Sequence, residues 1–298
     1  MTVVLLHGIG GPAWGPVRRA LRQVAGFGRD GEPPPQPSPA TAGEGEERHS
    51  LAPSPAVAGE GERGALAPSP AVAGEGWGGG LLDWPLPGYG DSAPLPETSF
   101  EAIATALWDA LDARGIARAD LIGHSIGGMV ALEFVARFPD RVRSLVLYAT
   151  TPSFGGRDPA FAEAFLRARL GPLDAGLSMA EAAPRMLDGL IGANADPAAL
   201  PAAIAALSAV PEAVYRSTVR CLTTFDRRDA LPRITVPTLL IAGEHDKAAP
   251  LRTMQRMAEA IPGARLVVLP GAGHLGHLEQ PATFHAALVG FLASLPQE

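Results

Sequence analysis

The sequence is poor in cysteine and has no long apolar run. Its only cysteine, Cys221, cannot form an internal disulfide, which suits a reducing compartment, and we expect a buried thiol there. No stretch approaches the roughly 20 apolar residues that a transmembrane helix needs. The first residues lack the basic segment followed by an apolar one that marks a secretory signal. We therefore expect a cytoplasmic protein.

The chain also lacks a concentrated charge of either sign. Its formal net charge of −7 is spread along the sequence, so nothing indicates a surface for nucleic acid. Neither a dinucleotide-binding fingerprint nor a clustered His/Cys ligand set is present. We expect no metal, no organic cofactor, no nucleic-acid partner and no membrane association. A hydrophobic content of 47% is enough for a sizeable core.

Residues 31–80 lack the composition of a packed core. The unit Pro-Ser-Pro-Ala-(Thr/Val)-Ala-Gly-Glu-Gly occurs at 37–45, 53–61 and 68–76. No copy has an apolar face that could stack on a neighbour. The pattern predicts a disordered, low-complexity insert. A proline-rich recognition tract is the less favoured alternative, because PxxP spacing with basic flanks is absent.

The segment 119–128 carries the strongest chemical signal. An apolar strand runs into Gly-His-Ser-Ile-Gly, and an apolar helix follows. This is the context of a G-x-S-x-G nucleophile elbow, which presents Ser125 on a sharp turn. The N–H of Ile126 opens the helix and can stabilise an oxyanion. The alternative role for Ser125 is that of an ordinary helix N-cap.

Two further apolar runs predict buried strands with an ionisable residue just beyond each. Residues 236–242 lead into Asp246, and residues 265–269 lead towards His274. Loops at the carboxyl ends of parallel strands are where active sites form. The order Ser, acid, His is the one that the elbow requires. A serine hydroxyl becomes a good nucleophile when an imidazole takes its proton and a carboxylate orients that imidazole.

Together with the strand 3–6 and the loop 87–92, these segments resemble the α/β-hydrolase fold family. The resemblance covers nearly the whole chain apart from the insert. It implies an α/β fold with a mostly parallel, doubly wound sheet and a helical cap. It also implies roles for five residues: nucleophile Ser125, acid Asp246, base His274, and oxyanion-hole N–H groups from Ile9 and Ile126.

Several residues compete for these roles. His277 is an alternative base, although we expect it on the following helical turn, facing the cap. Glu244 and Asp226 are alternatives to Asp246. Neighbouring arginines favour an ion pair for Asp226. His7 can polarise the oxyanion loop, but a hydrogen-bonded structural role is favoured.

The resemblance also divides the chain. Residues 1–30 and 81–151 form the first part of the core, and residues 230–298 form the second. The segment 152–229 is Ala-rich without a strand-like run, which predicts a helical cap over the active site. The family's usual N-terminal hairpin has no room before the first strand, so we expect the strand at 81–84 at or near a sheet edge.

The sequence thus favours a serine hydrolase that cleaves a small carboxylic ester or lactone through an acyl-enzyme intermediate. The C-terminal third is similar to the 3-oxoadipate enol-lactonase-like branch in residues 225–231, 241–243 and 270–281. A C–C bond hydrolase or an acyltransferase on the same triad is the first alternative. A non-catalytic ligand-binding protein or a degenerate hydrolase-fold protein is the second. The sequence does not determine the oligomeric state.

Overall fold

A six-stranded parallel sheet is the centre of the molecule in the computed structural model, which describes residues 2–22, 80–155, 159–192 and 195–296. All of the described residues belong to one compact unit. The strand order is β2-β1-β3-β4-β5-β6, and every neighbouring pair is parallel. The strands are β1 (Val3–Leu6), β2 (Leu81–Trp84), β3 (Ala119–His124), β4 (Val142–Tyr148), β5 (Thr238–Gly243) and β6 (Arg265–Leu269).

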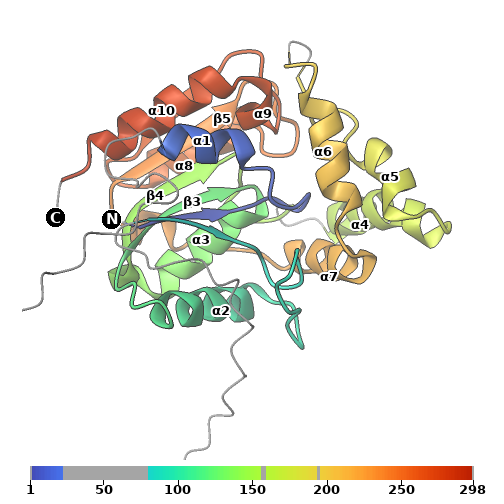
Figure 1. Ribbon diagram of the computed structural model, residues 1–298, viewed down its shortest axis with the longest axis horizontal. Helices are drawn as coiled ribbons and strands as arrows, with labels where there is room; N and C mark the ends of the chain where they lie inside the picture. Colours follow the sequence, from blue (N-terminus) through green and yellow to red (C-terminus); the bar gives the residue numbers. More distant parts are fainter. Residues whose placement is uncertain (1, 23–79, 156–158, 193–194, 297–298) are drawn as a thin grey trace, which may run out of the picture. The chain divides into compact units, whose positions relative to one another are not determined.

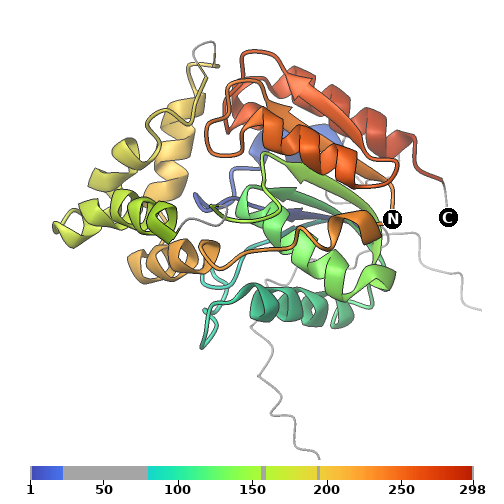
Figure 2. The same cartoon turned by 180° about the vertical axis from the view of Figure 1, so that it is seen from behind.

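Helices cover both faces of this sheet (Figures 1 and 2). One layer consists of α1 (Gly15–Arg22) and α10 (Pro281–Ala293), and the other of α2 (Phe100–Asp112), α3 (Ile126–Arg137) and α8 (Leu251–Ala260). The parallel, doubly wound α/β architecture expected from the sequence is therefore confirmed.

Strand β1 is apolar along its whole length because both faces of the sheet are buried. Because side chains alternate across a strand, Val3 and Leu5 face one helix layer and Val4 and Leu6 face the other. The first pair packs in the apolar cluster that includes α1 and α10, and the second pair in the cluster that includes α2 and α3. All four side chains are fully buried. A sheet covered on both sides needs such continuous apolar runs.

Strand β2 lies at one edge of the sheet. It pairs with β1 alone, from Val3 opposite Leu81 to Leu6 opposite Trp84. The expected edge position is thus confirmed. Most of the predicted insert 31–80 lies outside the described residues; only Gly80, immediately before β2, is among them.

Between β4 and β5 the described residues form four helices, which we call the cap. They are α4 (Pro159–Asp174), α5 (Met179–Met186), α6 (Ala199–Ser208) and α7 (Glu212–Leu222). Helix α5 begins with a capping box in which Ser178 and Glu181 satisfy each other's backbone N–H groups. After α7 the chain returns to the core, where the guanidinium of Arg227 contacts the buried Glu133 carboxylate at 2.6 Å.

Short elements complete the fold. The helix α9 (Gly276–Glu279) lies directly before α10, and 3-10 turns span Pro139–Arg141 and Leu231–Arg233. Among the residues that the structure describes, no helix has the length and apolar character needed to cross a bilayer.

Candidate active site

The turn between β3 and α3 places Ser125 in a strained conformation. Its φ is 54° and its ψ is −119°, a region that non-glycine residues rarely adopt. Two contacts hold the turn: the Ser125 N–H donates to the Tyr148 carbonyl at 3.0 Å, and the Thr150 hydroxyl donates to the Ser125 carbonyl at 2.7 Å. The hydroxyl of Ser125 is therefore presented at the carboxyl end of β3.

Close backbone approach explains the two glycines of the motif. A Cβ on Gly123 would lie 2.4 Å from the Gly127 carbonyl oxygen, and a Cβ on Gly127 would lie 2.1 Å from the Leu6 carbonyl oxygen. Both distances are shorter than any real carbon contact. Gly123 thus lets the end of β3 meet the start of α3, and Gly127 lets α3 pack against the end of β1.

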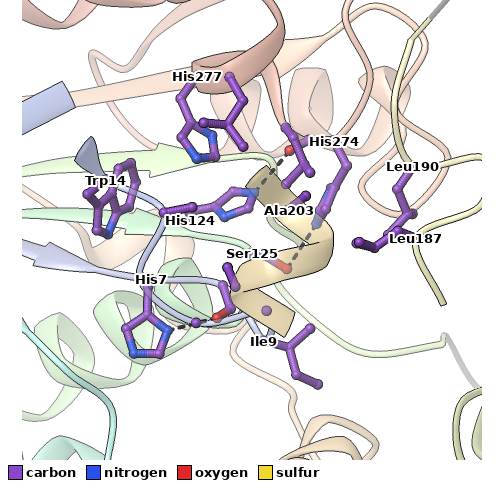
Figure 3. Close-up of a pocket in the computed structure, with 17 residues that line it drawn as sticks. His7, Ile9, Trp14, His124, Ser125, Leu187, Leu190, Ala203, His274 and His277 are labelled. Atoms are coloured by element: carbon purple, nitrogen blue, oxygen red, sulfur yellow. Dashed lines mark hydrogen bonds between the residues drawn. The ribbon is translucent and has the colours of Figure 1, made fainter. Parts of the chain in front are cut away.

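The structure brings the three predicted site residues into one hydrogen-bonded chain, of which Figure 3 shows the contact between Ser125 and His274. His274 Nε2 lies 3.0 Å from Ser125 Oγ, and His274 Nδ1 lies 2.8 Å from Asp246 Oδ2. A carboxylate oxygen accepts, so the ring proton is on Nδ1 and Nε2 is left to accept from the serine hydroxyl. The arrangement can move the hydroxyl proton to imidazole, as general-base chemistry requires.

The Asp246 carboxylate is itself held by backbone N–H groups. Its Oδ1 accepts from the amides of Ala248 and Ala249 at 2.8 and 2.9 Å, and the residue is 4% exposed. One oxygen is thus committed to the loop after β5 and the other to His274. This arrangement fixes the direction from which the carboxylate meets the imidazole.

The loop after β1 is organised by His7. Because the Leu86 N–H donates to His7 Nε2 at 2.9 Å, the ring proton lies on Nδ1, which donates to the Gly8 carbonyl at 2.8 Å. Burial lowers the pKa of His7 to about 4, which keeps the ring neutral. The Gly11 N–H also donates to the Gly8 carbonyl. The structural role expected for His7 thus includes orienting the peptide that carries the Ile9 N–H.

The two candidate oxyanion donors are free of protein acceptors. Within the described part of the chain, neither the Ile9 N–H nor the Ile126 N–H donates to another protein group. Ile126 is the first residue of α3, where N–H groups have no intrahelical partner. Ile9 lines the same pocket as Ser125. Both groups are therefore available to an oxygen atom of a bound molecule.

The pocket above Ser125 is largely apolar. It holds about 520 Å³ of empty space, including its open mouth. Core loops and the cap both contribute to its walls, and the cap supplies Leu187, Leu190, Ala203 and Ala206. None of the described residues that line it is Asp, Glu, Lys or Arg.

His124 and His277 also line this pocket, and both have lowered pKa values that favour the neutral ring. Burial and the neighbouring imidazoles lower the pKa of His124 well below its usual value, and burial lowers that of His277 to about 3. The ring of His277 packs 5.2 Å from Trp14 and 6.0 Å from Phe284, between centroids. The expectation that His277 faces the cap is wrong. The short helix α9 turns it back towards the core beneath the pocket.

The other sequence candidates lie elsewhere. Glu244 is exposed and accepts from the Gly271 N–H at 2.8 Å, while Asp226 pairs with Arg228, the kind of ion pair that was predicted. Cys221 is buried, which raises the pKa of its thiol to about 11. No group of three or more His, Cys, Asp or Glu side chains in the described ranges could hold a metal ion.

One residue at the site was missed by the sequence analysis. The Glu279 carboxylate is 4% exposed and accepts from the N–H groups of Gly273 and Leu275, on either side of His274. Its third donor, the Gly192 N–H, comes from the cap. The available signal was weak, because a glutamate before Gln280-Pro281 is what an ordinary helix start contains.

Comparisons with known proteins agree with this fold. Residues 66–281 match the family model described as alpha/beta hydrolase fold. Among curated proteins, the chain is 34% identical over 208 residues to "Putative carbamate hydrolase RutD" of Pseudomonas savastanoi pv. phaseolicola, covering 67% of this chain and 78% of that protein. It is 30% identical over 221 residues to the pimeloyl-acyl-carrier-protein methyl ester esterase of Chromobacterium violaceum. This match covers 70% of this chain and 81% of that protein.

A solved structure extends the likeness in fold. The enol-lactonase from Burkholderia xenovorans LB400 superposes with a TM-score of 0.72 at 22% identity, covering 98% of this chain and 91% of that one. At this level of identity the match speaks for the fold of the chain alone.

Proposed function

The chain belongs to the α/β-hydrolase family, and from that premise we propose that it is a serine hydrolase that cleaves a carboxylic ester or a lactone through an acyl-enzyme intermediate. The observation that carries the proposal is the 3.0 Å contact between Ser125 Oγ and His274 Nε2, with Asp246 at the other ring nitrogen. The name of the similar methyl ester esterase also supports it.

In the first half-reaction Ser125 Oγ attacks the ester carbonyl carbon while its proton passes to His274 Nε2. The carbonyl π electrons move to the oxygen, which becomes an oxyanion between the N–H groups of Ile9 and Ile126. When the intermediate collapses, the bond to the alcohol oxygen breaks. That oxygen takes the proton from His274, and the acyl group stays on Ser125.

In the second half-reaction water attacks the acyl-enzyme. His274 takes a proton from the water and passes it to Ser125 Oγ as the acid leaves. Asp246 stabilises the imidazolium in both halves without taking its proton. A lactone follows the same course, except that the alcohol formed in the first half remains covalently attached to the acyl chain.

The pocket also indicates the kind of acyl group. Leucine and alanine side chains from the cap face Ser125, and the lining residues His7, His124 and His277 have lowered pKa values. A carboxylate buried there would find no cation among the described lining residues. We therefore propose a neutral, apolar acyl group.

The test is a panel of p-nitrophenyl esters of increasing chain length, with lactones alongside, on the wild type and on Ser125→Ala. Ester turnover by the wild type and its loss in Ser125→Ala is the expected result. Mass spectrometry of the quenched reaction should find the acyl group on the peptide that contains Ser125. Equal turnover by both proteins would reject the proposal. Vinylogous diketones and acceptor alcohols in the same panel test for C–C hydrolysis and acyl transfer.

A further inference from the structure

The backbone of His274 is held by long-range hydrogen bonds on both of its peptide groups. Its N–H donates to the Leu190 carbonyl of the cap at 2.7 Å. Its carbonyl accepts from His124 Nε2 at 3.0 Å and from the Tyr148 hydroxyl at 3.1 Å. A loop residue between β6 and α9 is thus fixed by contacts from the cap, β3 and β4.

Glu279 adds the contacts on either side of this residue. Its Oε2 accepts from the Gly273 N–H at 2.8 Å, and its Oε1 accepts from the Leu275 N–H at 2.8 Å. The same Oε2 also accepts from the Gly192 N–H at 2.7 Å. One carboxylate therefore joins both amides that flank His274 to the loop between α5 and α6.

The packing at this junction is tight. A Cβ on Gly192 would lie 2.9 Å from Glu279 Oε2 and 2.3 Å from the Gly271 carbonyl oxygen. A Cβ on Gly273 would lie 2.5 Å from the Leu190 carbonyl oxygen. The two loops can meet at this distance only because each has a glycine where the backbones cross. The contact is thus built into the sequence of both loops.

A buried carboxylate needs compensation for lost hydration. Among the described residues no Lys, Arg or His forms an ion pair with Glu279, and its compensation comes from three backbone N–H groups. Hydrogen bonds to a carboxylate are the strong, short kind. The two equivalent oxygens of the carboxylate accept from all three donors. A neutral side chain in its place lacks two such oxygens, so the charge of Glu279 matters for the geometry of this loop.

We propose that Glu279 is a positioning residue. It fixes the position of the His274 imidazole and couples that position to the position of the cap loop 190–192. The proposal rests on the role proposed above for His274. Glu279 does not line the pocket, so it acts through His274 and not on the substrate. His274 Nε2 comes within hydrogen-bonding distance of Ser125 Oγ when two contacts with the cap loop are made. The loop's Gly192 N–H donates to Glu279, and its Leu190 carbonyl accepts from the His274 N–H.

Glu279→Gln is the first test. The amide has one acceptor oxygen, and its NH₂ group faces an N–H donor, so at least one of the three contacts is lost. We expect kcat for p-nitrophenyl butyrate to fall about 10- to 100-fold, the scale of a displacement near 1 Å, with KM within about twofold. Glu244→Gln is the matched control, because Glu244 accepts from an amide of the same loop but is exposed. We expect that control to stay within about twofold of the wild type.

A second variant and a count of sites separate positioning from folding. Glu279→Asp keeps the charge but shortens the reach, and we expect kcat between those of wild type and Glu279→Gln. A fluorophosphonate reaction run to completion counts the competent sites in each protein. A merely structural role would lower the number of sites and the Tm and leave kcat per site unchanged. A kcat per site within about twofold of the wild type in both Glu279 variants would overturn the proposal.

The two proposals fail separately. If the wild type shows hydrolysis that depends on Ser125 and the Glu279 variants match it, only the positioning role is wrong. If no such hydrolysis exists, crystal structures of wild type and Glu279→Gln provide the readout. We expect the distance from Ser125 Oγ to His274 Nε2 to lengthen in the variant, and an unchanged distance would overturn the positioning role.

Discussion

His124 Nε2 donates a 3.0 Å hydrogen bond to the backbone carbonyl of His274. The residue immediately before Ser125 therefore holds the backbone of the residue whose ring contacts Ser125. The His124 ring stacks on Tyr148 at 4.6 Å, and the Tyr148 hydroxyl donates to the same carbonyl. The elbow and the histidine loop are thus joined by a direct contact beneath the pocket.

His124→Phe tests that junction. Phenylalanine keeps the stacked ring but removes the donor, so the His274 carbonyl retains only Tyr148. We expect the free energy of unfolding to fall by about 1 kcal/mol, and kcat to fall about tenfold because His274 becomes less well placed. Urea unfolding and ester kinetics provide the measurements. His245→Phe, at an exposed position, serves as the control and should change neither value.

The proposed roles of His274 and Asp246 predict a ranked set of losses. His274→Ala should lower kcat by about 10⁴ or more, because it removes the base from the nucleophile unit. Asp246→Asn should cost about 10³–10⁴, because the imidazole then adopts the wrong tautomer. His277→Ala and Asp226→Asn are the matched controls. An active His274→Ala together with an inactive His277→Ala would reassign the base.

The uncharged pocket predicts a preference among acyl groups. p-Nitrophenyl butyrate should be hydrolysed with kcat/KM at least about 100-fold above that of the p-nitrophenyl hemisuccinate, because a buried carboxylate without a cation costs several kcal/mol. Leu187→Arg places a guanidinium on the pocket wall, and it should narrow the difference. Leu187→Met is the control of similar volume. Equal rates on the two esters with wild type would contradict the preference.

The buried histidines predict a pH dependence of stability. His7 and His277 have pKa values of about 4 and about 3, below the 6.5 expected in the unfolded chain. At pH values between the folded and the unfolded pKa, the unfolded chain binds protons that the folded chain does not. The free energy of unfolding therefore falls as the pH drops below about 6.5. The slope is at most about 1.4 kcal/mol per pH unit for each histidine.

The contribution of one histidine can be isolated by comparing urea unfolding at pH 7 and pH 5. In His277→Phe the loss of stability on acidification should be about 1–2 kcal/mol smaller than in wild type. In His245→Gln, at an exposed position, the loss should match the wild type. If wild type and His277→Phe lost the same amount, His277 would have to be protonated in the folded state.

Deletion of the repeat insert tests whether this segment contributes to folding or activity. Residues 31–76 contain none of the candidate site residues, and joining Asp30 to Trp77 should leave kcat/KM within about twofold. The effect on stability should be on the order of 1–2 kcal/mol, because closure entropy depends weakly on loop length. Ester kinetics and a thermal melt measure both. If deletion abolished folding, the insert would have to be treated as part of the structure.

The sequence predicts those features that depend on local pattern. Ser125, Asp246 and His274 each follow an apolar run, and parallel strands bring the ends of such runs to the same edge of a sheet. The edge position of β2 was also expected, and among the described strands β2 pairs with β1 alone. These inferences need only the order of elements along the chain.

What the sequence does not predict depends on contacts between distant residues. Glu279 and Gly192 are 87 positions apart, and nothing in either segment indicates that a carboxylate of one meets an amide of the other. The orientation of His277 was misjudged for the same kind of reason. Four residues of α9 decide which way its side chain turns, and helical periodicity cannot resolve so short an element.

The distribution of the site over the sheet has a consequence for biosynthesis. Among the described strands, Ile9 follows β1, the first along the chain, whereas His274 follows β6, the last along the chain and the edge of the sheet opposite β2. During translation the elbow and the loop of Ile9 emerge before His274, the proposed base. A nascent chain that still lacks β6 and the loop after it therefore cannot contain the proposed triad, and the proposed hydrolysis should appear only after β6 has docked.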